Sequence, residues 1–369
     1  MPRISFAAAA ILASSAWVCA APQVPPATTP ATTASTNPTT QPARGPRGAG
    51  RGAGAANIRV EPLADAQAVE LTPPLDKNGN FKISPKTAWR DVQPIQVAAD
   101  TPRGTVTAFQ LTGADAVAVE GGGGGGRAGG GGRGGGGGRN CWVYVPAGYK
   151  DGMTIPFIVD HDGSERAVVQ TQLIAAMDNL IAQKRIPMMG AIFIAPVSRS
   201  QEYDTVSGKY ADYIETHVIP VAQKTGNVKF TQDPDGRGAI GQSSGSTAAM
   251  GMAWFHSPAF TRIISYSGSF TQIRKSQTAP KGAQEYQDSL IPNTDKKPIR
   301  IWMEVGSNDL NNQFGDWRIN NNNMANALKA RGYDYQFLWA DGAGHVEGGV
   351  ERQTITEAME WVWKTYQAK

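Results

Sequence analysis

The sequence predicts an α/β fold in which a mostly parallel, doubly wound sheet is covered by helices on both faces. From residue 141 onward, short continuous apolar segments alternate with longer segments of helical periodicity, as in repeated strand–helix units. The apolar segments lack the alternation of a sheet with one wet face, so both faces must be covered. An antiparallel β lead-in is expected before them.

Residues 1–20 are expected to be a signal peptide. Arg3 precedes an apolar run with small residues, and residues 18–20 fit a small-residue cleavage site. No later segment approaches the ~20 apolar residues of a membrane span. Lipid attachment at Cys19 is a competing interpretation, although Trp17 departs from the usual lead-in to such a site. The pattern predicts export to the periplasm or the medium, with a bacterial envelope as the setting.

Residues 21–57 are expected to form a disordered tether, because Ala, Pro, Thr, Gly and Arg dominate and offer almost no core side chains. Seven arginines fall in the signal, tether and glycine-rich segments, namely Arg3, Arg44, Arg47, Arg51, Arg127, Arg133 and Arg139. Without these seven, 28 basic residues remain against 31 acidic ones, a net charge of −3. The folded part is then mildly acidic, which argues against a nucleic-acid-binding core.

Residues 58–140 are expected to form the N-terminal β lead-in. Its segments rich in β-branched residues are 92–97, 105–111 and 116–119. Residues 121–138 are nearly pure glycine and are expected to form a floppy loop between two paired strands. Their spacing does not match a phosphate-binding loop.

Residues 141–369 are expected to form the main α/β domain. Its predicted strands are 142–145, 157–160, 191–195, 238–241, 263–266, 299–305 and 335–339. Its predicted helices are 167–184, 209–225, 244–256, 320–331 and 352–366. Once Cys19 is removed, Cys141 is the lone cysteine, so no intrachain disulfide forms. Cys141 is a candidate nucleophile, but its place in a predicted strand favours a buried, small hydrophobic residue.

The sharpest chemical signal is the segment Gly241-Gln242-Ser243-Ser244-Gly245, a G-x-S-x-G pattern between a predicted strand and a predicted helix. A serine in this context lies on a tight turn with its hydroxyl exposed at the carboxyl end of the sheet. The N–H of Ser244 and the helix N-terminus can then stabilise developing negative charge. We predict Ser243 to be a nucleophile; the alternative is a glycine-rich turn with a solvated serine.

A serine nucleophile needs a base. The chain has four histidines, namely His161, His217, His256 and His345. Where this motif occurs, the chain order is serine, acid, histidine, so only His256 and His345 qualify. His256 ends the helix that follows Ser243 and would lie roughly 20 Å away at ~1.5 Å per residue. His345 lies in a loop between the last strand and the last helix, so we predict His345 to be the base.

The acid must lie between the nucleophile and the base, after a strand. Asp309 follows the predicted strand 299–305 in the segment Gly306-Ser307-Asn308-Asp309. It would hold the imidazole tautomer of His345 and offset its charge after protonation. Glu304, within the strand, and Asp316, further along the loop, remain alternatives.

A second oxyanion donor is expected after the predicted strand 157–160. The backbone N–H of Gly163 or Ser164 would complement that of Ser244. His161 is expected to line the substrate pocket. No second ligand at metal spacing accompanies it, so neither a metal nor a cofactor is predicted.

The chain resembles the esterase D and enterochelin esterase-like group of α/β hydrolases, which includes feruloyl and acetyl xylan esterases of carbohydrate esterase family one. Matching segments lie at 143–149, 162–163, 199, 202–203, 241–245, 256–260, 265–270, 306–309, 325–328 and 344–345. The resemblance implies an α/β-hydrolase fold with Ser243, Asp309 and His345 as the triad. Arg199 and Gln242, in matched segments, are expected to bind substrate with His161.

One departure from the family concerns the residues after the nucleophile. The family often has Met-Gly-Gly there, whereas this chain has Ser244-Gly245-Ser246, which leaves the pocket chemistry open. Three tryptophans are candidates for stacking on a sugar or phenolic ring, although core packing is their commoner role: Trp302, Trp317 and Trp339.

The predicted function is therefore an exported serine esterase that forms an acyl-enzyme. Family members cleave acyl esters on sugars, phenolic acids or siderophores, so a small-molecule or carbohydrate-linked ester is the expected substrate. An acyltransferase with the same triad and a non-catalytic envelope binding protein remain alternatives. Neither a nucleic-acid partner nor a transmembrane segment is expected, and the oligomeric state stays open.

Overall fold

The computed structural model describes residues 59–117, 138–164 and 172–367. The predicted signal peptide and tether, and nearly all of the glycine-rich loop, lie outside these residues. Within them, no helix combines the length and the hydropathy needed to cross a bilayer.

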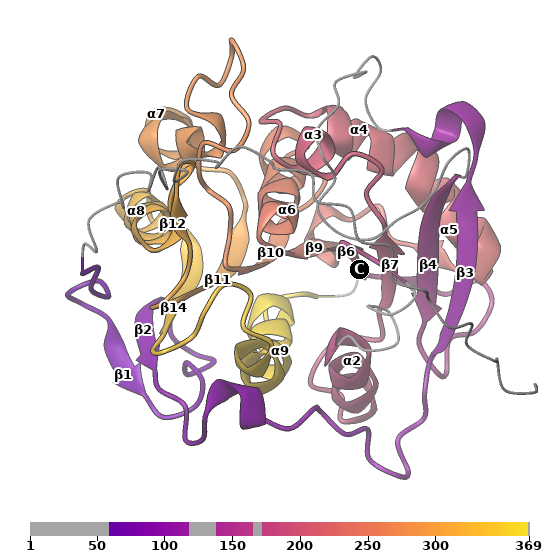
Figure 1. Cartoon of the computed structure of the whole chain (residues 1–369). Coiled ribbons are helices and arrows are strands. Elements are labelled where there is room, and N and C mark those ends of the chain that lie inside the picture. Colours follow the sequence, from indigo (N-terminus) through magenta and orange to yellow (C-terminus); the bar gives the residue numbers. More distant parts are fainter. Residues whose placement is uncertain (1–58, 118–137, 165–171, 368–369) are drawn as a thin grey trace, which may run out of the picture. The chain divides into compact units, whose positions relative to one another are not determined.

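A ten-stranded sheet forms the centre of the described chain (Figure 1). From edge to edge its strands are β1 (Gln67–Val69), β2 (Gly79–Ile83), β14 (Asp334–Ala340), β11 (Arg300–Gly306), β10 (Arg262–Tyr266), β9 (Arg237–Gln242), β6 (Phe157–His161), β7 (Gly190–Ile194), β4 (Arg139–Val145) and β3 (Thr105–Leu111). All neighbours are parallel except the last two pairs, β7–β4 and β4–β3. The predicted α/β fold with a mostly parallel sheet is confirmed.

Helices cover both faces of the sheet, and each layer buries its own hydrophobic core. Helices α2 (Gln172–Ala182) and α9 (Gly348–Trp363) pack together on one face (Figure 1). The other face carries α3 (Arg199–Tyr203), α4 (Lys209–Tyr213), α5 (Ile219–Gly226), α6 (Ser244–Phe255), α7 (Ile291–Asn293) and α8 (Trp317–Ala330). The short strand pairs are β5 (Thr154–Ile155) with β8 (Lys229–Phe230), and β12 (Asn311–Asn312) with β13 (Gly315–Asp316). Burial of both sheet faces explains why the strand sequences are continuously apolar.

The predicted β segment at 92–97 is wrong. These residues form an extended loop after a 3₁₀ turn at Trp89–Asp91. Side chains of α2 bind the loop backbone, since Ile95 N–H donates to Gln172 Oε1 (2.7 Å) and Asn179 Nδ2 donates to the Gln96 carbonyl (2.9 Å). Because these side-chain amides supply hydrogen-bond partners for the loop backbone, the segment does not pair with a neighbouring strand.

The lead-in contributes to both edges of the main sheet. The segment predicted at 105–111 is β3, which pairs antiparallel with β4, whereas β1 and β2 join the opposite edge in parallel beside β14. The lead-in is thus antiparallel only in part. Arg139, predicted to belong with the glycine-rich segment, begins β4 and is buried in an ion pair with Glu202. It therefore belongs to the folded part of the chain.

Candidate active site

Within four neighbouring parallel strands, β14, β11, β10 and β9, three are followed by a member of the predicted triad at the same edge of the sheet. In the sheet register, Tyr266 of β10 lies beside Gln242 of β9 and Glu304 of β11. Ser243 follows β9 directly, Asp309 follows β11 and His345 follows β14. Because the carboxyl ends of parallel strands share one edge, these distant segments converge there.

Ser243 lies on a sharp turn between β9 and α6. Its backbone has φ 56° and ψ −122°, a conformation that costs free energy for a residue with a side chain. Its N–H donates to the carbonyl of Tyr266 (2.9 Å), which holds the turn in place. A methyl group at Gly241 would lie only 2.1 Å from the carbonyl carbon of Gly245, so the first glycine of the motif is required by close packing. The turn presents the Ser243 hydroxyl at the sheet edge.

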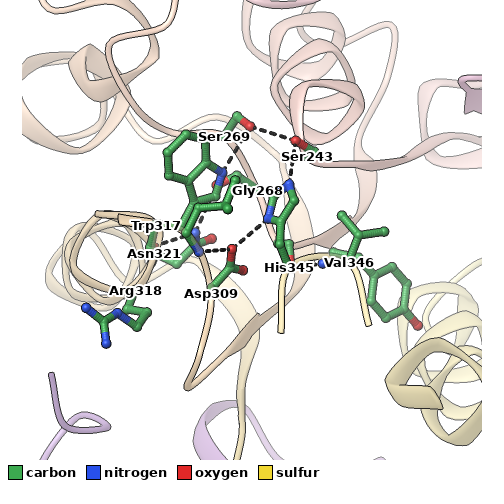
Figure 2. A network of polar contacts seen from close by, with 12 residues as sticks. Ser243, Gly268, Ser269, Asp309, Trp317, Arg318, Asn321, His345 and Val346 are labelled. Atoms are coloured by element: carbon green, nitrogen blue, oxygen red, sulfur yellow. Dashed lines mark hydrogen bonds and ion pairs between the residues drawn. The ribbon is translucent and has the colours of Figure 1, made fainter. Parts of the chain in front are cut away.

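The three side chains form a hydrogen-bonded series (Figure 2). His345 Nε2 lies 3.0 Å from Ser243 Oγ, and His345 Nδ1 lies 2.6 Å from Asp309 Oδ1. Asp309 is buried, with 5% of its surface exposed, whereas the His345 side chain keeps 23% exposed. In the neutral tautomer with a proton on Nδ1, His345 donates to Asp309 and accepts from Ser243. This arrangement suits a general base.

The loops that bear Asp309 and His345 are joined by backbone hydrogen bonds. Ser307 N–H donates to the Ala340 carbonyl (2.9 Å), and Asn308 N–H donates to the Ala343 carbonyl (2.8 Å). A methyl group at Gly306 would lie 2.4 Å from the Ala343 oxygen, so the loops touch because glycine stands there. The acid and the base are therefore held at a fixed separation.

The two alternative acids are engaged elsewhere. Glu304 is buried within β11, with 1% of its surface exposed. Burial, and then the neighbouring charge of Asp309, raises the pKa of Glu304 well above its ordinary value, which favours the neutral form of this carboxyl. Asp316 caps α8 by accepting from Arg318 N–H and pairs with the Arg318 guanidinium. Only Asp309 reaches His345.

The predicted oxyanion donors have different fates. Ser244 is the first residue of α6, where backbone N–H groups have no partner within the helix. The prediction of Gly163 as an oxyanion donor is not supported, because its backbone N–H already donates to the Ile194 carbonyl (2.9 Å). Ser164 is the last described residue before the gap at 165–171, and its role stays a prediction.

The burial of His161 contradicts its predicted place in the substrate pocket. Its ring is 4% exposed, packs beside the rings of Tyr203 and Tyr210, and has the Tyr210 hydroxyl 3.3 Å from Nδ1. Burial, helped by the charge of Arg199, lowers the pKa of His161 to about 3. The ring therefore belongs to an aromatic layer beneath the loop after β6.

Arg199 and Gln242 both lie near the nucleophile, but neither is a free side chain. The Arg199 guanidinium forms two hydrogen bonds with the Asp162 carboxylate, at 2.7 and 2.6 Å, and a third with the Gln242 carbonyl at 3.2 Å. Gln242 Nε2 donates to Glu351 of α9 (2.9 Å). Arg199 thus fastens the 162–164 loop to the nucleophile turn, and its predicted contact with substrate stays untested.

Sequence reasoning missed Ser269, which lies next to Ser243. Its hydroxyl lies 3.1 Å from Ser243 Oγ and accepts a hydrogen bond from the Trp317 indole at 3.1 Å. The available signal was position alone, because Ser269 follows β10, the strand adjacent to that of the nucleophile. Trp317, like Trp302 and Trp339, is buried, so none of the three presents a face for stacking on a ring.

The remaining candidates lie away from the triad. His217 pairs with Asp115 and His256 with Asp212. Cys141 is fully buried, and burial raises the pKa of its thiol to about 12, so it is not a reactive thiolate. Among the described residues, no group of three His, Cys, Asp or Glu side chains is arranged to hold a metal.

Comparison with known proteins adds sequence and structural relatives. Residues 136–349 match the family described as "Esterase: Putative esterase". Over 187 residues the chain is 27% identical to the uncharacterized protein YbbA of Bacillus subtilis. The aligned region covers 46% of this chain and 69% of that protein.

Two solved structures share the fold. A ferulic acid esterase from Anaeromyces mucronatus matches with a TM-score of 0.52 and 12% identity, covering 74% of this chain and 94% of that one. A ferric enterobactin esterase from Salmonella typhimurium matches with a TM-score of 0.50 and 17% identity, covering 76% of this chain and 62% of that one. At these identities the similarity is one of fold.

Proposed function

This chain belongs to the esterase family and is a carboxylic ester hydrolase, and from that premise we propose that it is an exported serine esterase acting through Ser243, His345 and Asp309. The observation that carries the proposal is the series of hydrogen bonds from Ser243 through His345 to Asp309, at 3.0 and 2.6 Å. Export is supported by the sequence of residues 1–20.

The first half-reaction forms the acyl-enzyme. Ser243 Oγ attacks the ester carbonyl carbon while His345 Nε2 takes the hydroxyl proton, and Asp309 offsets the imidazolium charge. The Ser244 N–H and the N-terminus of α6 face the negative charge that develops on the carbonyl oxygen. When the tetrahedral intermediate collapses, His345 returns the proton to the departing alcohol oxygen.

The second half-reaction releases the acid. Water enters in place of the alcohol, His345 Nε2 takes one of its protons, and the hydroxyl attacks the acyl carbon. Ser243 Oγ then leaves with the proton from His345, which restores the starting enzyme. A neutral His345 with a free Nε2 lone pair is needed in both halves.

We propose acyl or feruloyl esters of carbohydrates, or siderophore-type esters, as the substrates. The support is the family membership and the fold shared with a ferulic acid esterase and a ferric enterobactin esterase. Turnover of methyl ferulate, acetylated xylan and a series of p-nitrophenyl esters would rank these classes.

The test of the nucleophile is the substitution Ser243→Ala. We expect a loss on the order of 10⁶-fold in kcat on p-nitrophenyl acetate and no labelling by a fluorophosphonate, because the variant lacks the hydroxyl that is bonded to His345. Turnover at the wild-type rate would remove Ser243 from the mechanism. Mass spectrometry of protein secreted by the expressing cells tests export, which predicts a chain that begins after residue 20.

A further inference from the structure

The hydroxyl of Ser243 has a second neighbour besides His345. Ser269 Oγ lies 3.1 Å from Ser243 Oγ, and Trp317 Nε1 lies 3.1 Å from Ser269 Oγ. Figure 2 shows Ser269 between the indole and the nucleophile, apart from the imidazole. Ser269 and Trp317 are both buried.

The chemistry of these groups fixes the direction of each hydrogen bond. An indole N–H can only donate, so Ser269 Oγ is the acceptor for Trp317. Ser243 must donate to His345 Nε2 to lose its proton there, which leaves Ser243 Oγ to accept from the Ser269 hydroxyl. The bonds therefore run in one direction from Trp317 through Ser269, Ser243 and His345 to Asp309, and bonds aligned in this way strengthen one another.

The backbone around Ser269 holds its hydroxyl in this position. Ser269 N–H donates to the Ser243 carbonyl (3.1 Å), and the Ser269 carbonyl accepts from Thr247 Oγ1 (3.0 Å). Asn321 Nδ2 donates to the carbonyls of both Gly268 and Trp317, each at 2.9 Å. The first turns of α8 thus fasten the Ser269 loop to the indole.

Trp317 also connects this arrangement to the acid and the base. Its backbone N–H donates to the carbonyl of Leu310, the residue after Asp309 (2.9 Å). Its ring meets the His345 ring edge to face, with centroids 5.8 Å apart and an interplanar angle of 80°. A single buried tryptophan therefore contacts the base and, through one hydroxyl, the nucleophile.

We infer that Trp317, acting through Ser269, positions the Ser243 hydroxyl for attack and stabilises negative charge on its oxygen. The inference rests on the proposed role of Ser243. One lone pair of Ser243 Oγ accepts from Ser269, which directs the other at the substrate. The same bond supports the oxygen when its proton moves to His345 and again when it leaves the acyl group. Ser269 and Trp317 are positioning residues for this reaction.

The test is a double-mutant cycle with Ser269→Ala and Trp317→Phe, where phenylalanine keeps an aromatic ring but lacks the N–H. We expect Ser269→Ala to lower kcat about 10- to 100-fold with KM unchanged, and Trp317→Phe to lower it about 3- to 10-fold. Because Trp317 acts through Ser269, the double variant should be no slower than Ser269→Ala alone. Rates are expressed per site labelled by fluorophosphonate, so that unfolded protein does not count.

Ser265→Ala is the matched control. Ser265 is as buried as Ser269 and lies on the preceding strand, but its hydroxyl has no hydrogen-bond partner among the described residues. We expect its kcat per labelled site to stay within about twofold of wild type.

Three outcomes would overturn the inference: losses that multiply in the double variant, a change in KM alone, or an equal loss in Ser265→Ala. The proposed function fails separately, if Ser243→Ala retains turnover. An inactive Ser243→Ala beside a fully active Ser269→Ala would overturn only the positioning role.

Discussion

The two sides of Ser243 are built differently. On the proposed base side, the loops after β11 and β14 bring the side chains of Asp309 and His345 into line with Ser243, at 2.6 and 3.0 Å. On the proposed oxyanion side, backbone groups of the loop after β6 already have hydrogen-bond partners within the protein. Asp162 N–H donates to the Tyr203 hydroxyl (3.0 Å), and Gly163 N–H donates to the Ile194 carbonyl (2.9 Å).

The difference shows which functional groups can be found from sequence. The base side works through side chains, whose chemistry is written in the residue type and whose order along the chain is restricted. The oxyanion side works through backbone N–H groups, which nearly every residue has. An N–H group is available to the substrate only where no other group of the protein already accepts its hydrogen bond.

The largest expected effect concerns the base side and follows from Asp309→Asn. The amide carries no charge and can turn its NH2 group toward His345 Nδ1, so the imidazole is no longer held with its proton on Nδ1 and loses its counter-charge. We expect kcat on p-nitrophenyl acetate to fall about 10⁴-fold with the fold intact. A variant that kept most of its activity would remove Asp309 from the mechanism.

On the oxyanion side, Arg199→Ala should have the next largest effect. The substitution removes the two hydrogen bonds that hold Asp162, whose backbone has a φ of 66°, just before Gly163 and Ser164. We expect a loss of about 10- to 100-fold in kcat/KM, because the loop loses its fixed position. Arg185→Ala, which breaks an ion pair with Glu360, is the control and should keep wild-type kinetics. Equal losses in both variants would contradict a specific role for Arg199.

Glu304→Gln should change activity only slightly, because Glu304 is buried within β11 and Asp309, not Glu304, is bonded to His345. Its effect is on stability at higher pH. Since the folded-state pKa of Glu304 is raised, its stabilising contribution is full below the unfolded value near 4.5 and is lost as pH rises through the folded pKa. Between these two pKa values, the free energy of unfolding of wild type should fall with pH more steeply than that of the variant, by up to about 1.4 kcal/mol per pH unit. Urea unfolding between pH 5 and 9 measures the difference; parallel curves would contradict it.

The smallest expected effect on activity comes from His161→Phe, which tests the support beneath the oxyanion loop. The pKa of His161 is lowered to about 3, so its contribution to stability is present above about pH 6.5 and is lost as pH falls toward 3. The variant should unfold less readily in acid than wild type. His217→Gln is the control and should change acid unfolding less than His161→Phe does, because the His217 side chain is 41% exposed. If His161→Phe unfolded in acid at the same pH as wild type, the His161 ring would have to be exposed to solvent.

The strand–helix alternation predicted the centre of the fold well, because continuous apolar runs demand a sheet covered on both faces. Every strand predicted between 142 and 339 occurs, within a few residues of its expected bounds. The lead-in was less predictable. Phe81 and Ile83 are buried in β2, but a strand of only five residues that begins with a glycine gives a weak signal in the sequence. Its partner strand β14 lies more than 250 residues away.

The sequence alone determined the chemical identity and chain order of the serine, acid and histidine, and the close-packed turn that presents the serine. The tertiary structure placed Asp309, and not Glu304, beside His345. It buried His161, gave the N–H of Gly163 a partner and placed Ser269 beside Ser243. The reason is physical. Residue type fixes which bonds a group can make, whereas burial and the distance to groups remote in sequence fix which of those bonds form.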